Sequence, residues 1–196
     1  PDKTWVIVKN LQKKYPRLNL IIREFRQGLG SAYIAGFRYA LAKEYDYIIQ
    51  MDCDFSHNPK MIPEFLKETK DCDWVIGSRY VKGGQIKGWE FKRKFLSWLG
   101  NGYAKLILGL KINDWTAGFN CWKRKTLQKI NLDSEGYPNG YAFQIAIKYK
   151  ALRAGFRPKE VSIIFKDRAK GQTKIGGGII NEAAITVIRL RLMRKV

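Results

Sequence analysis

Apolar positions along the chain follow two patterns, a helical spacing in some segments and short continuous runs in others, which indicates alternating helices and strands. The pattern predicts helices over residues 5–15, 31–44 and 61–66, and strands over residues 18–23, 47–51 and 74–79. Such alternation favours an α/β fold, because parallel strands need a crossover that is usually a helix. We therefore expect a mostly parallel sheet flanked by helices.

Two later segments mix apolar and basic positions. Residues 88–110 interleave aromatic side chains with lysines and an arginine, a composition typical of amphipathic helices that lie at a membrane surface. A helix packed on the sheet, with its apolar side in the core, is the alternative. Residues 179–196 are similar, and we expect this basic C-terminal helix to rest on a membrane or on a partner.

The length of 196 residues and the hydrophobic content of 45% suit one α/β domain with its own core. We assign residues 1–175 to this domain and residues 176–196 to the C-terminal helix, with the glycines at 176–178 as a hinge. The chain opens on Pro1 rather than Met, and we expect it to be a fragment of a longer protein.

Charge narrows the class of partner. Lys and Arg outnumber Asp and Glu by 37 to 17, which gives a net charge of +20 and calls for an anionic partner: nucleic acid, anionic lipid or a phosphorylated substrate. The three cysteines form no Cys-x-x-Cys pair, so we expect neither a disulfide scaffold nor a zinc site, and a reducing compartment. The sequence has no uncharged apolar run of about 18 residues that would span a bilayer.

Two carboxylates, Asp52 and Asp54, stand directly after the predicted strand 47–51. Ligands collect beyond the carboxyl ends of strands in open α/β sheets, and residues i and i+2 of an extended segment point the same way. One Mg²⁺ or Mn²⁺ could therefore take an oxygen from each and leave positions for substrate phosphates. The alternative is a turn in which the aspartates cap the helix that begins near Asn58 and Pro59.

The predicted strand 74–79 ends on Arg79, which places a guanidinium at the same edge of the sheet as the aspartates. Arginine can form a bidentate pair of hydrogen bonds with phosphate, which lysine cannot reproduce. A surface ion pair is the alternative role for Arg79 and for Arg168. We expect His57 to be a structural residue of the acidic loop.

The glycines at 28 and 30 precede the predicted helix 31–44, and they would permit an anion to approach the backbone amides at its N-terminus. A simple turn with Ser31 as the helix N-cap is an equal alternative. Gly28, Gly30 and Gly36 do not form the full Gly-x-Gly-x-x-Gly pattern, which disfavours a Rossmann dehydrogenase.

Short motifs recur in a fixed order along almost the whole chain. They comprise residues 26–30 with Ala32, Tyr33, Gly36 and Phe37; 51–57; 77–81 with Gly83 and Gly84; Gly88 and Trp89 with Arg93 and Ser97; 114–119; 140–144; and Asp167 and Arg168 with Gly171 and Lys174. This series resembles the polyprenol-phosphate mannosyltransferases, the dolichyl-phosphate mannose synthase group of inverting glycosyltransferases with a GT-A fold.

The resemblance implies transfer of mannose from GDP-mannose to a polyprenyl (dolichyl) phosphate at the cytoplasmic face of a membrane, with the protein peripherally associated. It implies Mg²⁺ or Mn²⁺ at Asp52, Asp54 and Ser56; donor binding by Asp52, Asp54, Arg79, Arg168, Lys174 and Gly28; catalytic roles for Asp54, Arg79 and Arg168; and lipid-phosphate binding by Arg93 and Ser97. The anionic lipid phosphate can attack the sugar without a protein general base, so catalysis consists of alignment and charge neutralisation.

Family members begin with two strands whose motifs are not found in this sequence, so about the first forty residues of such an enzyme are expected to be missing. A membrane-anchoring subunit or segment would belong to the whole protein. We expect the chain alone to bind its donor poorly. A different sugar donor, such as a glucosyl donor, is the nearest alternative. A basic nucleic-acid-binding module is the alternative of another class, although paired aspartates would repel a phosphate backbone.

Overall fold

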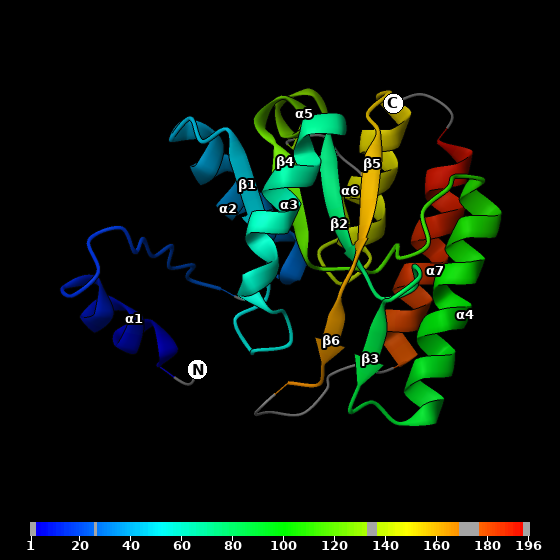
Figure 1. Ribbon diagram of the computed structural model, residues 1–196, viewed down its shortest axis with the longest axis horizontal. Coiled ribbons are helices and arrows are strands. Elements are labelled where there is room, and N and C mark those ends of the chain that lie inside the picture. The colour runs from blue at the N-terminus through cyan, green and yellow to red at the C-terminus, as the bar shows by residue number, and fades with distance from the viewer. Residues whose placement is uncertain (1–2, 26, 133–136, 169–176, 194–196) are drawn as a thin grey trace.

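The computed structural model describes residues 3–25, 27–132, 137–168 and 177–193. Its elements are α1 (Thr4–Gln12), α2 (Leu29–Ala42), β1 (Tyr47–Gln50), the 3-10 helix η1 (Pro59–Met61), α3 (Ile62–Glu68), the 3-10 helix η2 (Thr69–Asp71), β2 (Trp74–Ser78), β3 (Gln85–Lys87), α4 (Phe91–Leu108), β4 (Asn120–Lys123), α5 (Arg124–Lys129), α6 (Phe143–Arg153), β5 (Pro158–Ser162), β6 (Ile164–Lys166) and α7 (Gly177–Leu192). Figure 1 shows a twisted sheet flanked by helices, which confirms the predicted α/β class.

The central sheet has the strand order β1-β4-β2-β5. β2 and β5 are parallel, whereas β4 is antiparallel to both β1 and β2. Three strands therefore run in one direction and β4 runs against them, a mixed pattern that the sequence did not predict. In the register of β2 and β4, Trp74 lies opposite Trp122, and their stacked rings, 5.2 Å apart, anchor the centre of the sheet.

A short second sheet continues the first. β3 and β6 pair in parallel. In the chain, β3 follows β2 and β6 follows β5, and β2 and β5 are themselves a parallel pair (Figure 1). Helix α3 packs closely on β2, because a side chain at Gly77 would place its Cβ 2.9 Å from the Phe65 ring. Residues 79–89 follow β2 and residues 163–168 follow β5, so the pairing of β3 with β6 brings both segments to one side of the molecule.

Helix α6 lies in the main hydrophobic core. Every residue from Phe143 to Ala151 is buried, because the helix contacts α2 on one side and α7 on another. Apolar burial of this extent is the dominant stabilising contribution in such a domain. Helices α4 and α7 also pack against each other, and they stand side by side beyond the β5 side of the sheet (Figure 1).

The C-terminal helix is part of this core. Val187 and Leu190 of α7 are buried in the same cluster as α6, and Gly177 and Gly178 already belong to α7. Gly176, the remaining position of the expected hinge, lies outside the described residues. No described helix is both long enough and apolar enough to cross a bilayer.

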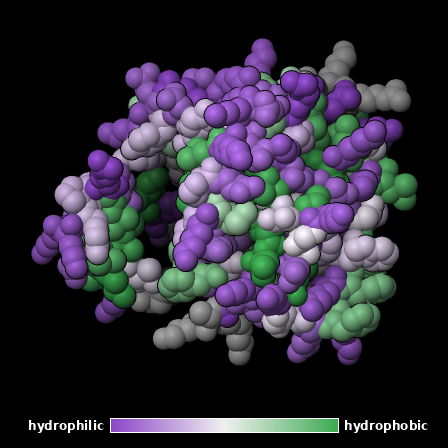
Figure 2. All heavy atoms as spheres, in the orientation of Figure 1, coloured by the Kyte–Doolittle hydropathy of each residue, from purple (hydrophilic) through white to green (hydrophobic). Residues whose placement is uncertain are grey.

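The N-terminal part differs from the prediction. Residues 18–23 form no strand, and α1 ends at Gln12 rather than near Tyr15 and buries none of its residues. Ile21 and Ile22 are exposed. A strand forms only against a partner, and within the described chain this segment has none, while β1 is at the sheet edge. Figure 1 shows α1 standing away from the sheet, and Figure 2 shows open space between them.

Candidate active site

A cavity of about 500 Å³ opens where β1 and β2 end. Its polar lining includes Asp52, His57, Arg79, Arg93, Ser97, Thr116 and Arg168. Its apolar lining runs between α4 and α7 and includes Leu96, Leu99, Tyr103, Ile179, Ile180, Ala183 and Ala184. The cavity therefore joins a charged end at the sheet to an apolar arm between two helices.

The acidic residues lie in a bent loop after β1. Residues 53–57 form bends and Phe55 has a left-handed backbone with φ of 65°, so the extended geometry expected for Asp52 and Asp54 is wrong. The Asp52 side chain accepts a hydrogen bond from the Tyr33 hydroxyl at 2.9 Å, and its backbone N–H donates to His57 Nδ1 at 3.0 Å. Asn58 itself caps η1, so the helix is not capped by an aspartate.

Asp54 is held by its neighbours. Its Oδ1 accepts hydrogen bonds from the Ser56 hydroxyl at 2.5 Å and the Ser56 backbone N–H at 3.0 Å, and its Oδ2 lies 3.8 Å from Arg168 Nε. Partial burial acts to raise the pKa of Asp54, but Ser56 and Arg168 outweigh it and hold the pKa below its ordinary value. The Ser56 hydroxyl oxygen is the atom that would bind a metal, and here it donates a hydrogen bond to the Asp54 carboxylate.

His57 is buried beneath the loop. Its ring stacks on Phe119 at 5.0 Å and meets Phe165 edge-on at 5.5 Å. Burial lowers the pKa of His57, and its Nδ1 accepts from the Asp52 amide, which requires the unprotonated nitrogen. The imidazole therefore has a structural role, in which it packs on Phe119 and Phe165 and holds the backbone of the acidic loop at Asp52.

Arg79 reaches the charged end from β2, with 8% of its side chain exposed. Its Nε and Nη2 donate to Asp114 at 2.7 and 2.6 Å, and Nη2 also donates to Thr116 Oγ1 at 2.7 Å. Burial acts to raise the pKa of Asp114, but Arg79 holds it below its ordinary value. Part of the predicted phosphate-binding fork is therefore already paired with a buried carboxylate.

Arg93 and Ser97 face the cavity one turn apart on α4. The Arg93 guanidinium lies 3.8 Å above the Trp89 ring and its Nη1 is 3.1 Å from Asp167 Oδ1, while Ser97 Oγ accepts from the Tyr80 hydroxyl at 2.8 Å. Within the described chain, Arg93 Nε has no hydrogen-bond acceptor. The structure thus brings Asp52, Arg79, Arg93, Ser97 and Arg168 to one cavity, with Asp54 beside Arg168.

Two predicted donor-binding residues are not in this group. Lys174 lies outside the described residues. Gly28 does not line the cavity; it packs on another loop, where an added Cβ would lie 2.2 Å from the Asn139 carbonyl oxygen. Close backbone packing is thus sufficient reason for glycine here. Ser31 is not the N-cap, because α2 begins at Leu29 and the Ser31 hydroxyl donates to the Gly28 carbonyl.

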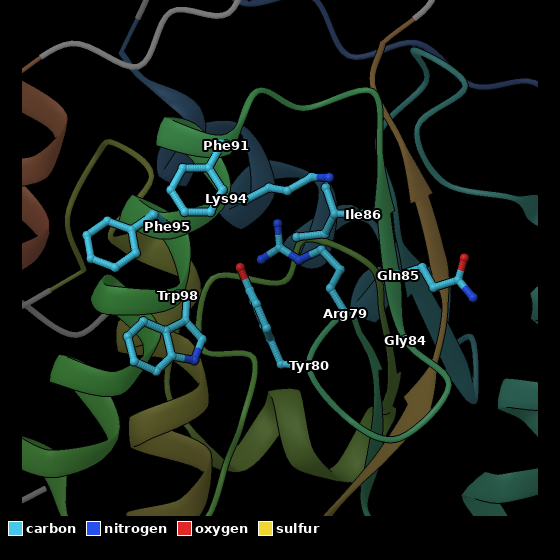
Figure 3. Close-up of a pocket in the computed structure, with 9 residues that line it drawn as sticks. All are labelled: Arg79, Tyr80, Gly84, Gln85, Ile86, Phe91, Lys94, Phe95 and Trp98. Carbon is cyan, nitrogen blue, oxygen red and sulfur yellow. The ribbon is translucent and has the colours of Figure 1, made fainter.

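A second cavity, of about 520 Å³, lies against α4 and is drawn in Figure 3. Phe91, Phe95 and Trp98 project from α4 as a row, with successive rings 6.2 and 6.1 Å apart. Arg79, Tyr80 and Ile86 project from the opposite side of the cavity (Figure 3). The three α4 side chains, here called the aromatic row, are 80%, 49% and 59% exposed.

Comparison with known proteins decides the family. The family model described as glycosyl transferase family 2 matches residues 1–131. The chain belongs to glycosyl transferase family 2. The undecaprenyl-phosphate mannosyltransferase of Micrococcus luteus is 40% identical over 189 residues, which cover 96% of this chain and 77% of the relative. The polyprenol monophosphomannose synthase of Mycolicibacterium smegmatis is 38% identical over 200 residues, covering 99% of this chain and 75% of the relative.

Solved structures agree with a glycosyltransferase fold. Glucosyl-3-phosphoglycerate synthase from Mycobacterium tuberculosis in complex with phosphoglyceric acid is similar with a TM-score of 0.61 at 14% identity, over 94% of this chain and 60% of that one. The same enzyme with Mn²⁺, UDP-glucose and phosphoglyceric acid gives a TM-score of 0.59 at 13% identity, over the same shares. This family 2 glycosyltransferase thus has the GT-A architecture expected from its motifs.

Sequence reasoning gave no role to several residues of this glycosyltransferase that shape the site. They are Tyr33, which holds Asp52; Asp114, which holds Arg79; and Asn101, Lys148 and Glu160, which hold the segment around Asp114. Tyr33 and Asp114 both belong to the series of motifs, so a signal was present for these two. The others act through contacts between distant segments, which a single sequence does not display.

Proposed function

We propose that this glycosyltransferase transfers mannose from GDP-mannose to the phosphate of a polyprenol such as dolichol, with inversion at the anomeric carbon. The observation that carries the proposal is the shape of the cavity. Its charged end suits a sugar diphosphate and a lipid phosphate, and its apolar arm between α4 and α7 suits an isoprenoid chain. Relatives that are polyprenol-phosphate mannosyltransferases support both the acceptor and the sugar.

The chain's own groups would bind and align the two phosphates. Arg93 lines the cavity, and its Nε finds no hydrogen-bond acceptor among the described residues; with Ser97 it would hold the lipid phosphate. Arg79 and Arg168, at the sheet end, would neutralise the donor diphosphate as it leaves. Since a lipid phosphate is anionic near neutral pH, no general base is required, and buried His57 needs no chemical role.

Asp52 and Asp54 would hold the divalent cation. Mg²⁺ is commonly held by one or two carboxylates together with substrate phosphates, and the lowered pKa of Asp54 keeps that carboxylate ionised. Among the described residues, no group of three or more Asp, Glu, His or Cys side chains is arranged to hold a metal ion, so phosphate oxygens would complete the shell. Mg²⁺ or Mn²⁺ would supply charge neutralisation of the leaving diphosphate, and a similar structure with Mn²⁺ and UDP-glucose supports this choice. Ser56 would orient Asp54.

The acceptor also implies a membrane. The aromatic row, with Lys92 and Lys94 on the same helix, would lie at the headgroup level of the cytoplasmic face, where aromatic rings and basic side chains are favoured. A membrane-anchoring subunit or a segment of a longer protein would strengthen this attachment. Nucleic acid is a poor fit, because the cavity arm is apolar.

The deciding experiment measures transfer from radiolabelled GDP-mannose to polyprenyl phosphate with Mg²⁺ or Mn²⁺. We expect a lipid-soluble mannosyl product that requires the metal and the lipid phosphate, and we expect Asp52→Asn and Asp54→Asn to reduce it at least a hundredfold. UDP-glucose and unphosphorylated polyprenol are the controls. A product formed equally well from unphosphorylated polyprenol, or only from UDP-glucose, would contradict the proposal.

Donor affinity is a separate test of the expected missing segment. We expect GDP-mannose to bind this chain more weakly than a version extended at the amino terminus, because α1 and the edge of β1 are left uncovered. Calorimetry on the two proteins makes the comparison. Equal affinity would show that residues 1–196 already contain the nucleotide pocket.

A further inference from the structure

The segment 113–117 passes beneath the charged end of the cavity and is held by side chains on three other elements. Glu160 of β5 accepts from the backbone N–H groups of Asn113 and Asp114 at 2.9 and 3.0 Å. Asn101 of α4 accepts from the N–H groups of Trp115 and Thr116 at 2.7 and 3.3 Å. The N–H groups of residues 113–116 are therefore satisfied by side chains and not by a sheet, and that of Ala117 donates to the Asp114 carbonyl oxygen at 3.4 Å.

Two carbonyl groups of the segment, those of Trp115 and Ala117, face Lys148 of α6. Its ammonium donates to the carbonyl oxygens of Trp115 at 3.1 Å and Ala117 at 2.7 Å, and to that of Gln144 at 3.4 Å. Lys148 is 0% exposed. An ammonium has three N–H donors, so these three carbonyls match it one for one. Burying such a charge is costly unless it is paired in this way.

The segment 113–117 matters because its residues contact Arg79 and line the charged end of the cavity. Asp114 holds the Arg79 guanidinium, and Thr116 and Gly118 line the cavity. Gly118 lies beside the acidic loop, since a Cβ there would be 3.9 Å from Asp52 Oδ2. A shift of the segment would therefore move groups on both sides of the charged end.

We propose that Lys148 is a positioning residue for the transfer reaction, which fixes segment 113–117 as the rigid floor on which Arg79 and Thr116 are aligned. The inference rests on the proposed function, because alignment is what that reaction requires of the protein. Burial lowers the pKa of Lys148 to about 7, opposed by Asp114 and Glu160 and reinforced by Arg79. Deprotonation leaves two N–H donors for three carbonyls, so the floor loosens as pH rises through this value.

Amide hydrogen exchange tests the floor without substrates. We expect Lys148→Met to speed exchange of the Trp115 and Thr116 amides at least tenfold. The matched control is Lys150→Met, which removes another buried lysine from α6, one that lies 3.7 Å over the Tyr137 ring, and it should leave these two amides unchanged. Equal effects of the two variants would overturn the proposal. If Lys148→Met does not fold, the unmodified chain is compared at pH 6 and pH 9 after correction for intrinsic exchange; no loss of protection at pH 9 would likewise overturn it.

The pH profile of kcat/KM separates positioning from general stability. We expect the unmodified chain and Lys150→Met to share an alkaline fall with a midpoint near pH 7, and Lys148→Met to lose that fall and to be at least tenfold slower at pH 6. A uniform reduction with an unchanged profile would overturn the proposal. If the chain transfers no mannose, the same comparison is made on binding of inorganic pyrophosphate, so that failure of the proposed function and failure of this inference remain distinct.

Discussion

At the scale of single residues, the site pairs most of its charges before any substrate arrives. Arg79 is paired with Asp114, Arg168 lies near Asp54, and Arg93 contacts Asp167. Buried charges that lack partners are expensive, which accounts for the pairing of buried Arg79 with Asp114, whereas Arg93 and Arg168 are partly exposed. The two hydrogen bonds to Asp114 also hold the Arg79 guanidinium in one orientation, which lowers the entropy that substrate binding must overcome.

Replacing Arg79 with Lys tests the importance of this orientation. Lysine keeps the charge, but a single ammonium cannot donate to both Asp114 oxygens and to Thr116 as the guanidinium does. We expect kcat/KM for transfer to fall about ten- to a hundredfold, with a loss of stability of about 1–3 kcal/mol. Steady-state kinetics and denaturant unfolding measure the two effects. A variant with unchanged kcat/KM would show that the guanidinium only holds Asp114.

The residue scale also shows what a sequence can reveal about a site. Asp52, Arg79, Arg93, Ser97 and Arg168 were named from motifs, and the structure brings all of them to one cavity. The orientation of each side chain could not be predicted, because it is set by partners far away in the chain, such as Asp114 for Arg79, 35 residues on. Ser56 and Gly28 were named for ligands, yet each makes a contact within the protein that accounts for its presence.

At the scale of elements, helices and buried strands were predicted well where their apolar pattern faces a core. α2, β1, α3 and β2 each form within a few residues of the expected bounds. The strand expected over 18–23 fails because strand formation depends on a pairing partner, and periodicity does not report whether one exists. The reversed β4 was missed for a related reason, since direction within a sheet depends on connections that propensity does not encode.

Two glycines of α2 give a matched test of packing between elements. A Cβ at Gly30 would lie 2.2 Å from the Pro138 carbonyl oxygen, whereas a Cβ at Gly36 would meet nothing within 4 Å. We expect Gly30→Ala to destabilise the protein by about 2–4 kcal/mol through steric overlap and Gly36→Ala to be neutral or to stabilise it by up to about 1 kcal/mol through helix propensity. Thermal and urea unfolding provide the comparison; similar effects at both positions would contradict the packing of α2 on residues 137–139.

The aromatic row gives a test of membrane attachment at the same scale. Replacing Phe95 and Trp98 with Ser should weaken binding to vesicles that contain anionic lipid by about tenfold or more, because two exposed rings that would enter the interface are removed. Vesicle co-sedimentation measures the loss. Tyr45→Ser removes a comparably exposed ring near β1 and should bind as the unmodified chain does. Unchanged binding of the α4 variant would mean that another surface meets the membrane.

At the scale of the whole molecule, one feature links stability to pH. Lys148 has a pKa of about 7 in the folded chain and an ordinary value of 10.5, so between these values the unfolded chain holds more protons than the folded one. The free energy of global unfolding therefore rises with pH across that window, because deprotonation removes a buried charge, even though the floor locally loses one N–H donor. This contribution is lost as the pH falls toward 7. Below pH 7 the lysine is protonated in both states and adds no further slope.

We therefore expect the free energy of unfolding of the unmodified chain, relative to that of Lys148→Met, to increase between pH 7 and pH 10 by up to roughly 1.4 kcal/mol per pH unit. Taking the difference between the two proteins removes the contribution of other groups that titrate in the same range. Denaturant unfolding at several pH values measures it. A difference that stays constant with pH would mean that Lys148 keeps an ordinary pKa in the fold.

The apolar arm is walled by α4 on one side and by α7 on the other, and α7 also contributes Val187 and Leu190 to the protein's core. A polyprenyl chain seated there would touch the same helices that bury those side chains, so substrate and protein would share one continuous dry interior. In the empty enzyme, water would then occupy the apolar arm between α4 and α7. Each lipid substrate would displace this water on binding, and water would return when the product leaves.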